Sequence, residues 1–368
     1  MYKDNLTIRR MRPGEEKKVR AITRESFPLT AWLFFSHKPA TLVALKDNQI
    51  VAGVVYGQFS YSKEINAGTI YWLFTAPDHQ GEGIGKKLIE KAIFKLETGG
   101  CQEIFACIEG YNSSSFKIFN SQGFSKLRLF DQINKFGFKT FYIWYQTHHL
   151  FDLGHDLWYL ELKEHENKVE NGLKTDKNKS MNIKTWIFNV TISSLIMFIA
   201  LLRTDLIDID IIDIFSVFLA IGITFGIRDL AGIIAGKGSG LNLEYDIWES
   251  GHIISIIMAI FAGGYIPVPG TYYPKDNNWS YQNKLPELAN QSLASAGALV
   301  VLGWILNFDF INGGKFIEIL LVAVTNMAIF DIALPFFPFV SYNGRRIWDY
   351  NKIIWLVLFI TLLGFIIF

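Results

Sequence analysis

The feature that most constrains this 368-residue chain is a series of long apolar runs that begins after Lys184. Each run can span or nearly span a hydrocarbon core about 30 Å thick. A further run, Ile253–Ile266, has fourteen residues and is followed by Pro267 and Pro269, which favours a re-entrant or interfacial segment over a tilted span. The sequence therefore predicts an all-α polytopic membrane domain over residues 185–368. Its five longer runs are Trp186–Leu202, Ile214–Ala235, Leu293–Phe308, Phe316–Phe337 and Ile353–Phe368.

The first 162 residues have the mixed composition of a soluble domain. Residues 163–184 are rich in Lys, Asn and Glu and contain no Phe, Trp or Tyr, so they predict a flexible charged linker. The formal net charge of +1 gives no reason to expect a nucleic-acid partner. We therefore expect a soluble domain over residues 1–162, joined by this linker to the membrane domain.

The order of elements in the first domain is of the α+β type. Two alternating runs turn at Asp47-Asn48 and predict a hairpin. A strand, "AGTIYWLFTAP", leads through a glycine-rich turn into an amphipathic helix that stops at Gly99-Gly100. A strand and a short helix follow, and then two or three terminal strands that end at "DLWYLEL".

The glycine-rich turn "QGEGIG", Gln80–Gly85, carries the clearest chemical signal in this domain. It lies at a predicted helix N-terminus, where amides without an intrahelical partner and the helix dipole both favour an anion. Glycines also let the backbone approach a pyrophosphate closely. The GxG pattern alone is weak, so the surrounding residues decide its meaning.

Those surroundings resemble the GNAT family of N-acetyltransferases over about residues 7–162. "FTAPDHQGEGIGKKL" matches the family's acetyl-CoA signature, and "NSSSFKIFNSQGF" resembles the Asn-helix-Gly-Phe block that follows it. The resemblance implies a mixed central sheet with flanking helices. It also implies that Phe74 and Thr75 hold the pantetheine arm and the thioester, and that Asn112 contacts the cofactor from the next helix. The residues that it implies for the pyrophosphate are Gln80, Gly81, Glu82, Gly83, Ile84, Gly85 and Lys86.

The same resemblance implies direct transfer, in which a base takes a proton from the attacking amine and an acid protonates the leaving thiolate. The usual acid is a tyrosine seven residues after the asparagine, and Phe119 stands there. The strand before the turn has no carboxylate to act as base. Tyr71, Tyr111 and Glu109 are replacements, although both tyrosines also fit core packing, so the catalytic residues stay unassigned. The histidines of "HHLFDLGH" have no metal-ligand spacing and are expected in a solvated loop.

An arginine and an aspartate, Arg228-Asp229, interrupt the second apolar run. Each would cost about 2.5–3.5 kcal/mol at the centre of a membrane helix, so such residues mark a site or the relic of one. "RDLAG", Arg228–Gly232, occupies the place of HExxH in zinc metalloproteases of the site-2 protease type. "DIALPFFPFVSYNGRRIWDYNKIIW" resembles that family's later membrane segment, and two blocks between them match in order.

The metal ligands of that family are missing here. Arg228 and Gly232 stand at the two histidine positions, Asp229 stands for the glutamate, and Asn343 stands for the later aspartate. Zinc needs about three protein donors, so no metal is expected. "WESGH", Trp248–His252, is better explained as a chance match than as a displaced HExxH motif. The pair Arg228-Asp229 is therefore interpreted as a structural pair held by partners across the helix bundle, in a pseudoprotease.

Together these observations predict an integral membrane N-acetyltransferase with its soluble domain in the cytoplasm. Its partners would be acetyl-CoA, an unidentified amine, the lipid bilayer and a membrane protein segment. One alternative is a sensor that binds acetyl-CoA and reports to the membrane domain, and a weaker one is an active intramembrane metalloprotease. Charge bias at Arg345, Arg346 and Lys352 favours five membrane crossings over six, with the C-terminus outside.

Overall fold

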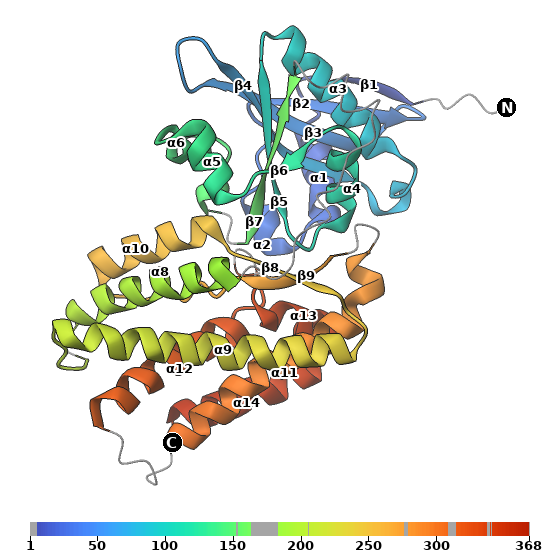
Figure 1. Cartoon of the computed structure of the whole chain (residues 1–368). Coiled ribbons are helices and arrows are strands. Elements are labelled where there is room, and N and C mark those ends of the chain that lie inside the picture. The colour runs from blue at the N-terminus through green and yellow to red at the C-terminus, as the bar shows by residue number, and fades with distance from the viewer. Residues whose placement is uncertain are drawn as a thin grey trace. The chain divides into compact units, whose positions relative to one another are not determined.

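The computed structural model describes residues 6–151, 154–162, 183–204, 206–275, 279–307, 314–336, 339 and 341–367. It divides into two compact units, coloured blue to green and green to red in Figure 1. The N-terminal unit comprises Met1–Leu150 and His155–Thr175, and the C-terminal unit comprises Phe151–Gly154 and Asp176–Phe368. Most of the predicted linker, residues 163–182, lies outside the described residues.

The N-terminal unit is built on one seven-stranded sheet of order β1-β2-β3-β4-β5-β7-β6. Its neighbouring strands are antiparallel, except that β4 and β5 are parallel. The sheet is therefore mixed, as the sequence predicts. The strands are β1 (Thr7–Arg10), β2 (Ala40–Lys46), β3 (Gln49–Ser60), β4 (Asn66–Thr75), β5 (Glu103–Glu109), β6 (Ser125–Lys126) and β7 (His155–Glu161).

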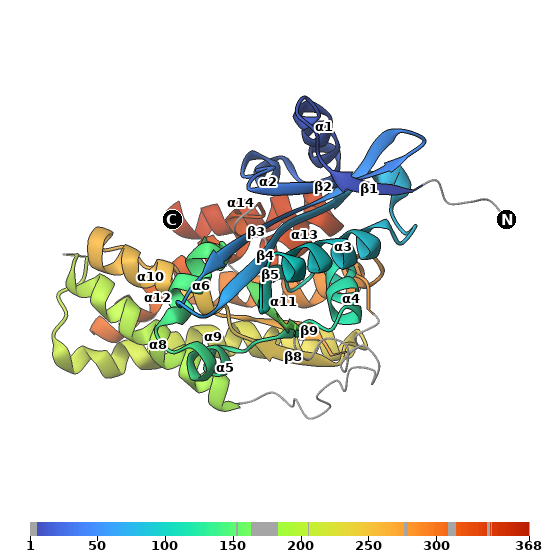
Figure 2. The same cartoon turned by 90° about the horizontal axis from the view of Figure 1, so that it is seen from above.

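Helices cover both faces of this sheet, and Figure 2 shows α1 and α3 on opposite sides of it. Alternation along β2 sends Leu42 to a core with Leu88 of α3, and Val43 to a second core with Val19 of α1. Both cores consist only of residues of this unit. The helices are α1 (Glu16–Ser26), α2 (Leu29–Leu33), α3 (Ile84–Thr98), α4 (Ser113–Ser121), α5 (Leu129–Phe136) and α6 (Lys139–Gln146), with 3₁₀ turns at Pro77–His79 and His149–Phe151.

The predicted hairpin between β2 and β3 is confirmed. Asp47 and Asn48 have φ of 51° and 62°, the left-handed conformation that a tight two-residue hairpin requires. The prediction of only strands after the fourth helix is wrong, because α5 and α6 lie between β6 and β7. Gly137, at φ 57°, separates these two helices, and the apolar residues on either side of it recur at helical rather than alternating spacing.

The C-terminal unit is a helix bundle with a two-stranded ribbon. Four of its described segments are long and apolar enough to cross a membrane: Ile183–Leu202, Ile211–Gly238, Tyr281–Asn307 and Gly314–Ala333. The helices are α8 (Ile183–Leu202), α9 (Ile214–Gly238), α10 (Glu249–Ala262), α11 (Tyr281–Asn307), α12 (Gly314–Ala333), α13 (Asn343–Tyr350) and α14 (Lys352–Ile367), with a 3₁₀ turn at Ile211–Asp213. The ribbon pairs β8 (Leu243–Asp246) with β9 (Thr271–Pro274).

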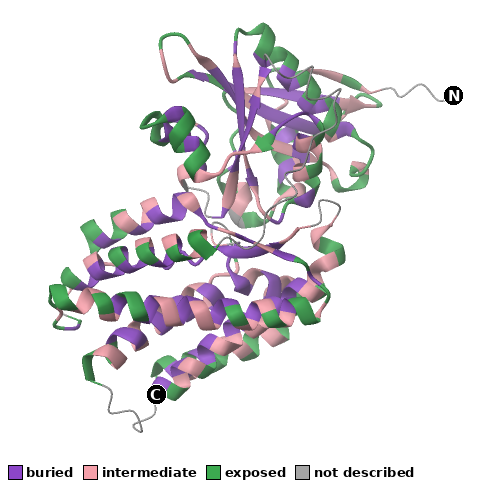
Figure 3. Ribbon diagram, viewed as in Figure 1, coloured by how far each residue is buried: buried purple, intermediate pink, exposed green. Residues whose placement is uncertain are grey.

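Two apolar helices of this unit are shorter, namely α10 with fourteen residues and α14 with sixteen. The outward faces of the bundle are apolar too, and Figure 3 shows exposed residues along them. A helix that is apolar on its inner and outer faces fits lipid surroundings. Exposed large apolar residues of the bundle include Leu195, Phe215, Leu219, Leu230, Ile234, Val301, Ile353, Val357 and Ile360.

Candidate functional site

The glycine turn of the N-terminal unit has the backbone geometry of an anion site. Gly81 and Gly83 have φ of +83° and +76°, and no atom lies within 4 Å of where a Cβ would stand on either. Helix α3 begins at Ile84, and its first backbone bond runs from the Lys87 N–H to the Gly83 carbonyl at 3.3 Å. The amides of residues 84–86 consequently have no acceptor within the helix and are available to a bound anion.

The side chain of Glu82 anchors this turn to its surroundings. Its carboxylate accepts a bond from Lys46 Nζ at 2.8 Å and lies 3.0 Å from His79 Nδ1. The pKa of Glu82 is lowered, chiefly by the Lys46 bond and then by His79. Glu82 thus ties the turn to Lys46 and His79 through its side chain.

Next to the turn, the sheet opens between β4 and β5. These strands pair only from Ala67–Ile70 and Glu103–Ala106, whereas β4 continues to pair with β3 as far as Thr75. From Tyr71 onward, the edge of β4 that faces β5 has no strand partner among the described residues. A free strand edge can bond an extended chain such as a pantetheine arm.

The structure defines what Phe74 and Thr75 can offer. The Phe74 ring is buried in the α1-side core, where a Cβ on Gly53 would lie 2.5 Å from it. The Thr75 carbonyl accepts bonds from Ser26 Oγ at 3.0 Å and Gln80 Nε2 at 3.3 Å. The Phe74 side chain thus belongs to the core, and the Thr75 carbonyl already has two donors.

Asn112 has a structural role that the sequence analysis did not foresee. Its side-chain oxygen accepts a bond from the Ser115 amide at 3.0 Å and caps the N-terminus of α4. A Cβ on Gly85 would lie 3.1 Å from Ile118 Cδ1, so that glycine lets α4 pack close to the start of α3. Contact between Asn112 and the cofactor stays a prediction.

The structure places Phe119 and the three candidate catalytic residues in different surroundings. Phe119 is buried against Phe124, with ring centroids 5.0 Å apart, in an apolar core. Tyr71 lies at the open edge of β4, where burial raises its pKa to about 12 and its hydroxyl donates to the Gln146 carbonyl at 3.1 Å. Tyr111 is buried, and Glu109 ends β5.

The structure also places His148 beside Tyr71, with ring centroids 4.9 Å apart. This contact could not be predicted from the sequence, because it depends on α5 and α6, a segment predicted as strand. Cys107 lies in the same region, and its thiol donates to the Thr147 carbonyl at 3.4 Å.

In the C-terminal unit, Arg228 lies in a buried network rather than alone. Its Nε and Nη2 each donate to Asp331 of α12 at 3.1 Å, and its Nη1 donates to Asp229 at 2.8 Å. Asp229 also accepts a bond from Trp186 Nε1 of α8 at 2.9 Å. The interpretation of a polar pair held by partners across the bundle is confirmed.

The network continues through Asn343 to a second arginine. Asn343 Nδ2 donates to Asp331 at 2.6 Å, and Arg346 Nη1 donates to Asn343 Oδ1 at 2.7 Å and to Ser292 Oγ at 3.1 Å. Two buried arginines therefore accompany two buried aspartates, which balances the charge. Asn343 is a connecting residue in this arrangement.

Gly232 of α9 lies against α11. A Cβ there would lie 2.2 Å from Ser295 Oγ, so the Ser295 hydroxyl must move to admit a larger side chain. No group of three His, Cys, Asp or Glu side chains that could hold a metal occurs among the described residues.

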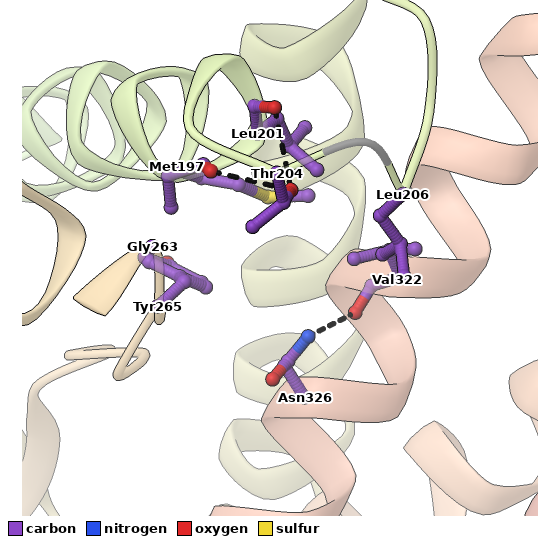
Figure 4. A pocket seen from close by; sticks show the side chains of 9 residues that line it. Met197, Leu201, Thr204, Leu206, Gly263, Tyr265, Val322 and Asn326 are labelled. Carbon is purple, nitrogen blue, oxygen red and sulfur yellow. Dashed lines mark hydrogen bonds between the residues drawn. The ribbon is translucent and has the colours of Figure 1, made fainter.

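A cavity of about 220 Å³ lies elsewhere in this unit, and none of its lining residues belongs to the polar network (Figure 4). Its walls are mostly apolar, with Thr204 and Asn326 bonded to carbonyls of their own helices. The lining residues are Met197, Ala200, Leu201, Thr204, Leu206, Gly263, Tyr265, Val322 and Asn326.

Among the curated proteins that resemble part of this chain are two named N-alpha-acetyltransferase 30. N-alpha-acetyltransferase 30 of Homo sapiens is 25% identical over 136 residues, which cover 32% of this chain and 38% of that protein. The Xenopus laevis protein of the same name is 29% identical over 127 residues, which cover 32% of this chain and 46% of that protein. The chain thus spans less than half the length of these relatives.

Solved structures similar to the chain include an Escherichia coli ribosomal-protein-S18-alanine N-acetyltransferase, at 18% identity and a TM-score of 0.29, covering 33% of this chain and 79% of that one. Arabidopsis thaliana Naa50 in complex with a bisubstrate analogue is similar at 16% identity and a TM-score of 0.30, covering 33% and 85%. Residues 8–124 match the family described as "Acetyltransferase (GNAT) family". The N-terminal unit therefore contains a GNAT acetyltransferase domain.

Proposed function

We propose that this chain is a membrane-tethered N-acetyltransferase that moves an acetyl group from acetyl-CoA to an amine, with its N-terminal unit in the cytoplasm. The observation that carries the proposal is the left-handed turn at Gly81 and Gly83 beside the free edge of β4. The match of residues 8–124 to the acetyltransferase family supports it.

Different backbone groups of the site would bind different parts of acetyl-CoA. Amides from Gly81 to Lys86 would bond the pyrophosphate at the positive end of α3. Backbone groups of β4 from Tyr71 to Thr75, apart from the Thr75 carbonyl, would bond the pantetheine arm, and the opening between β4 and β5 would hold the thioester. An amine that enters this opening can attack the thioester carbonyl, and the CoA thiolate then leaves.

The acceptor that fits best is the α-amino group of a peptide. The free edge of β4, "YWLFT", has no carboxylate to act as a base. An α-amino group has a pKa near 7.7–8.0, so roughly a third of it is neutral at pH 7.5, whereas a lysine side chain near 10.4 is about 0.1% neutral. A site with little basic power therefore favours the α-amine. The similarity to two proteins named N-alpha-acetyltransferase 30 supports the same acceptor class.

This proposal predicts a clear preference between two matched peptides. With purified full-length protein, a peptide with a free N-terminus should release CoA thiol at least about tenfold faster than the same peptide with a blocked N-terminus and a lysine side chain. The rate at subsaturating peptide should rise with pH through the α-amine pKa near 7.7–8.0. Equal rates for the two peptides would contradict the assignment of the acceptor.

A non-enzymatic sensor is the second candidate. Two observations favour it. Phe119 has apolar surroundings, and the Tyr71 hydroxyl already donates a hydrogen bond to the Gln146 carbonyl. A sensor would bind acetyl-CoA with no CoA release for any amine, so the same assay separates the two functions when binding is measured in parallel.

For the C-terminal unit we propose a pseudoprotease of the site-2 protease type that crosses the membrane five times. The bilayer would surround its helices, and its ligand would be a transmembrane segment of another protein. Support comes from Arg228, whose guanidinium lies between Asp229 and Asp331, and from Gly232, which packs closely against Ser295 of α11.

Purified full-length protein is accordingly expected to contain far less than one zinc per chain and to leave membrane peptides uncut. The double variant Arg228→His with Gly232→His should not gain activity, because Asp229 and Asn343 would still stand at the positions of the base and the third ligand. Elemental analysis is the measurement. One zinc per chain in the unaltered protein would revive the active protease as the function of this unit.

A further inference from the structure

Helix α6 has two apolar faces, and only one of them packs into the N-terminal unit. Ile143 and Trp144 are buried on the inner face. The outer face follows the spacing i, i+3, i+4, i+7, which places its side chains in one stripe. Its four aromatic residues are exposed: Phe138 94%, Phe141 48%, Tyr142 44% and Tyr145 58%.

Helix α5 adds Phe130 and Ile133, which are 54% and 46% exposed. These six side chains of α5 and α6 are called the aromatic stripe below. Figure 1 shows both helices on the opposite side of the sheet from α3 and α4. Six large apolar side chains exposed on two consecutive helices are more than scattered surface residues, and such patches mark interaction sites.

The stripe is not required to hold the two helices together. Gln132, fully buried between them, accepts a bond from Trp144 Nε1 at 2.6 Å and donates to the Leu127 carbonyl at 2.8 Å. Phe136 packs on the sheet against Phe105 and Tyr159. Inner contacts therefore fix α5 and α6. Within the stripe, Tyr142 also packs against Phe59 of β3 and Phe141 against Trp144, with ring centroids 6.3 and 5.7 Å apart, whereas Phe138 and Tyr145 are its most exposed rings.

The cations near the stripe are largely engaged within the unit. Lys126 pairs with Asp156 at 2.7 Å and Lys135 pairs with Glu161 at 3.2 Å. Lys139 lies 5.7 Å from the centre of the Tyr61 ring. A partner would consequently be recognised through apolar and aromatic contact more than through charge, and its binding should depend little on salt.

A short segment joins the N-terminal unit to the apolar helices that are proposed to cross a bilayer. Twenty residues separate Leu162, the end of the described N-terminal unit, from Ile183 at the start of α8. Fully extended, such a segment spans at most about 70 Å. We propose that the aromatic stripe of α5 and α6 inserts at the headgroup boundary of the bilayer that holds the apolar helices of the same chain. The inference rests on the membrane insertion proposed above. Rings with an apolar body and a polar tip, such as Tyr142 and Tyr145, suit that boundary.

The test distinguishes membrane binding by the aromatic stripe from retention through the covalent link to the C-terminal unit. A protease site is placed within residues 163–182 of the full-length protein, which is reconstituted in phosphatidylcholine vesicles and then cut. The N-terminal unit has its own two cores, so it is expected to stay folded after cleavage. The released unit is mixed with protein-free vesicles and floated, at low and at high salt.

The unaltered unit should float with protein-free vesicles at both salt concentrations. The variant Phe138→Ser, Phe141→Ser, Tyr145→Ser should partition at least about tenfold less. Phe94→Ser, which removes a 51% exposed ring from α3, is the matched control and should float like the unaltered unit.

Flotation that is equal for the triple variant, or absent for the unaltered unit, would overturn the proposal. Retention on the original proteoliposomes without binding to protein-free vesicles would also overturn it, because the partner would then be the C-terminal unit. Failure of membrane insertion is recognised separately, since the C-terminal fragment would then leave the vesicles after cleavage.

Discussion

Replacing Gly83 with aspartate is expected to lower the affinity for acetyl-CoA by at least about 100-fold. Gly83 has φ +76°, a left-handed conformation that costs a residue with a Cβ about 1–2 kcal/mol. The new carboxylate would also stand at the positive end of α3, where it would compete with the pyrophosphate for the free amides. Isothermal calorimetry with full-length protein measures the change.

Gly100→Asp is the matched control for that variant. Gly100 has φ +84° and open space around it, but it lies just after the C-terminal end of α3. It carries the same backbone strain and the same added charge, away from the turn. Gly100→Asp should keep its affinity for acetyl-CoA. Unchanged affinity in folded Gly83→Asp would disprove the location of the site.

Replacing Arg228 with leucine is expected to destabilise the C-terminal unit by about 3–5 kcal/mol. The change leaves Asp229 and Asp331 buried without the guanidinium that bonds both of them. An uncompensated buried charge is far more costly than the loss of one contact. Denaturant unfolding of the purified protein in detergent, followed by a signal from this unit, measures the effect.

Two further variants test whether the unpaired buried aspartates cause the loss of stability in Arg228→Leu. Arg228→Leu combined with Asp229→Asn and Asp331→Asn should recover a large part of the stability, because the stranded charges are then gone. Glu287→Ala, which removes a partly exposed pair with Lys284 at 2.9 Å, should change stability by no more than about 1 kcal/mol. Equal effects of Arg228→Leu and Glu287→Ala would show that the network contributes little.

Local chemistry made several features of the N-terminal unit predictable. The left-handed turn at Asp47-Asn48 and the glycines before α3 follow from residue types that tolerate positive φ. The helix α3 follows from apolar residues at helical spacing. Each of these depends on neighbours in the sequence, which a pattern can reveal.

Features that depend on distant contacts were not predictable. The segment of α5 and α6 carries two opposing signals, since its aromatic residues favour strands whereas their spacing is helical, and packing on the sheet decides between them. The opening between β4 and β5 depends on where their pairing ends, at Ile70 and Ala106. The sequence indicated that Arg228 needs a partner, but Asp331 lies 103 residues away and only the bundle brings them together.

The most direct test of the central claim is the location of the acetyl group after a single turnover. Full-length protein is mixed with labelled acetyl-CoA and an equimolar peptide that has a free N-terminus, and the products are identified by mass spectrometry. The account predicts the label on the α-amino group of the peptide, with one CoA thiol released for each peptide modified. Label that stays on intact, protein-bound acetyl-CoA would contradict it and would identify the chain as a sensor.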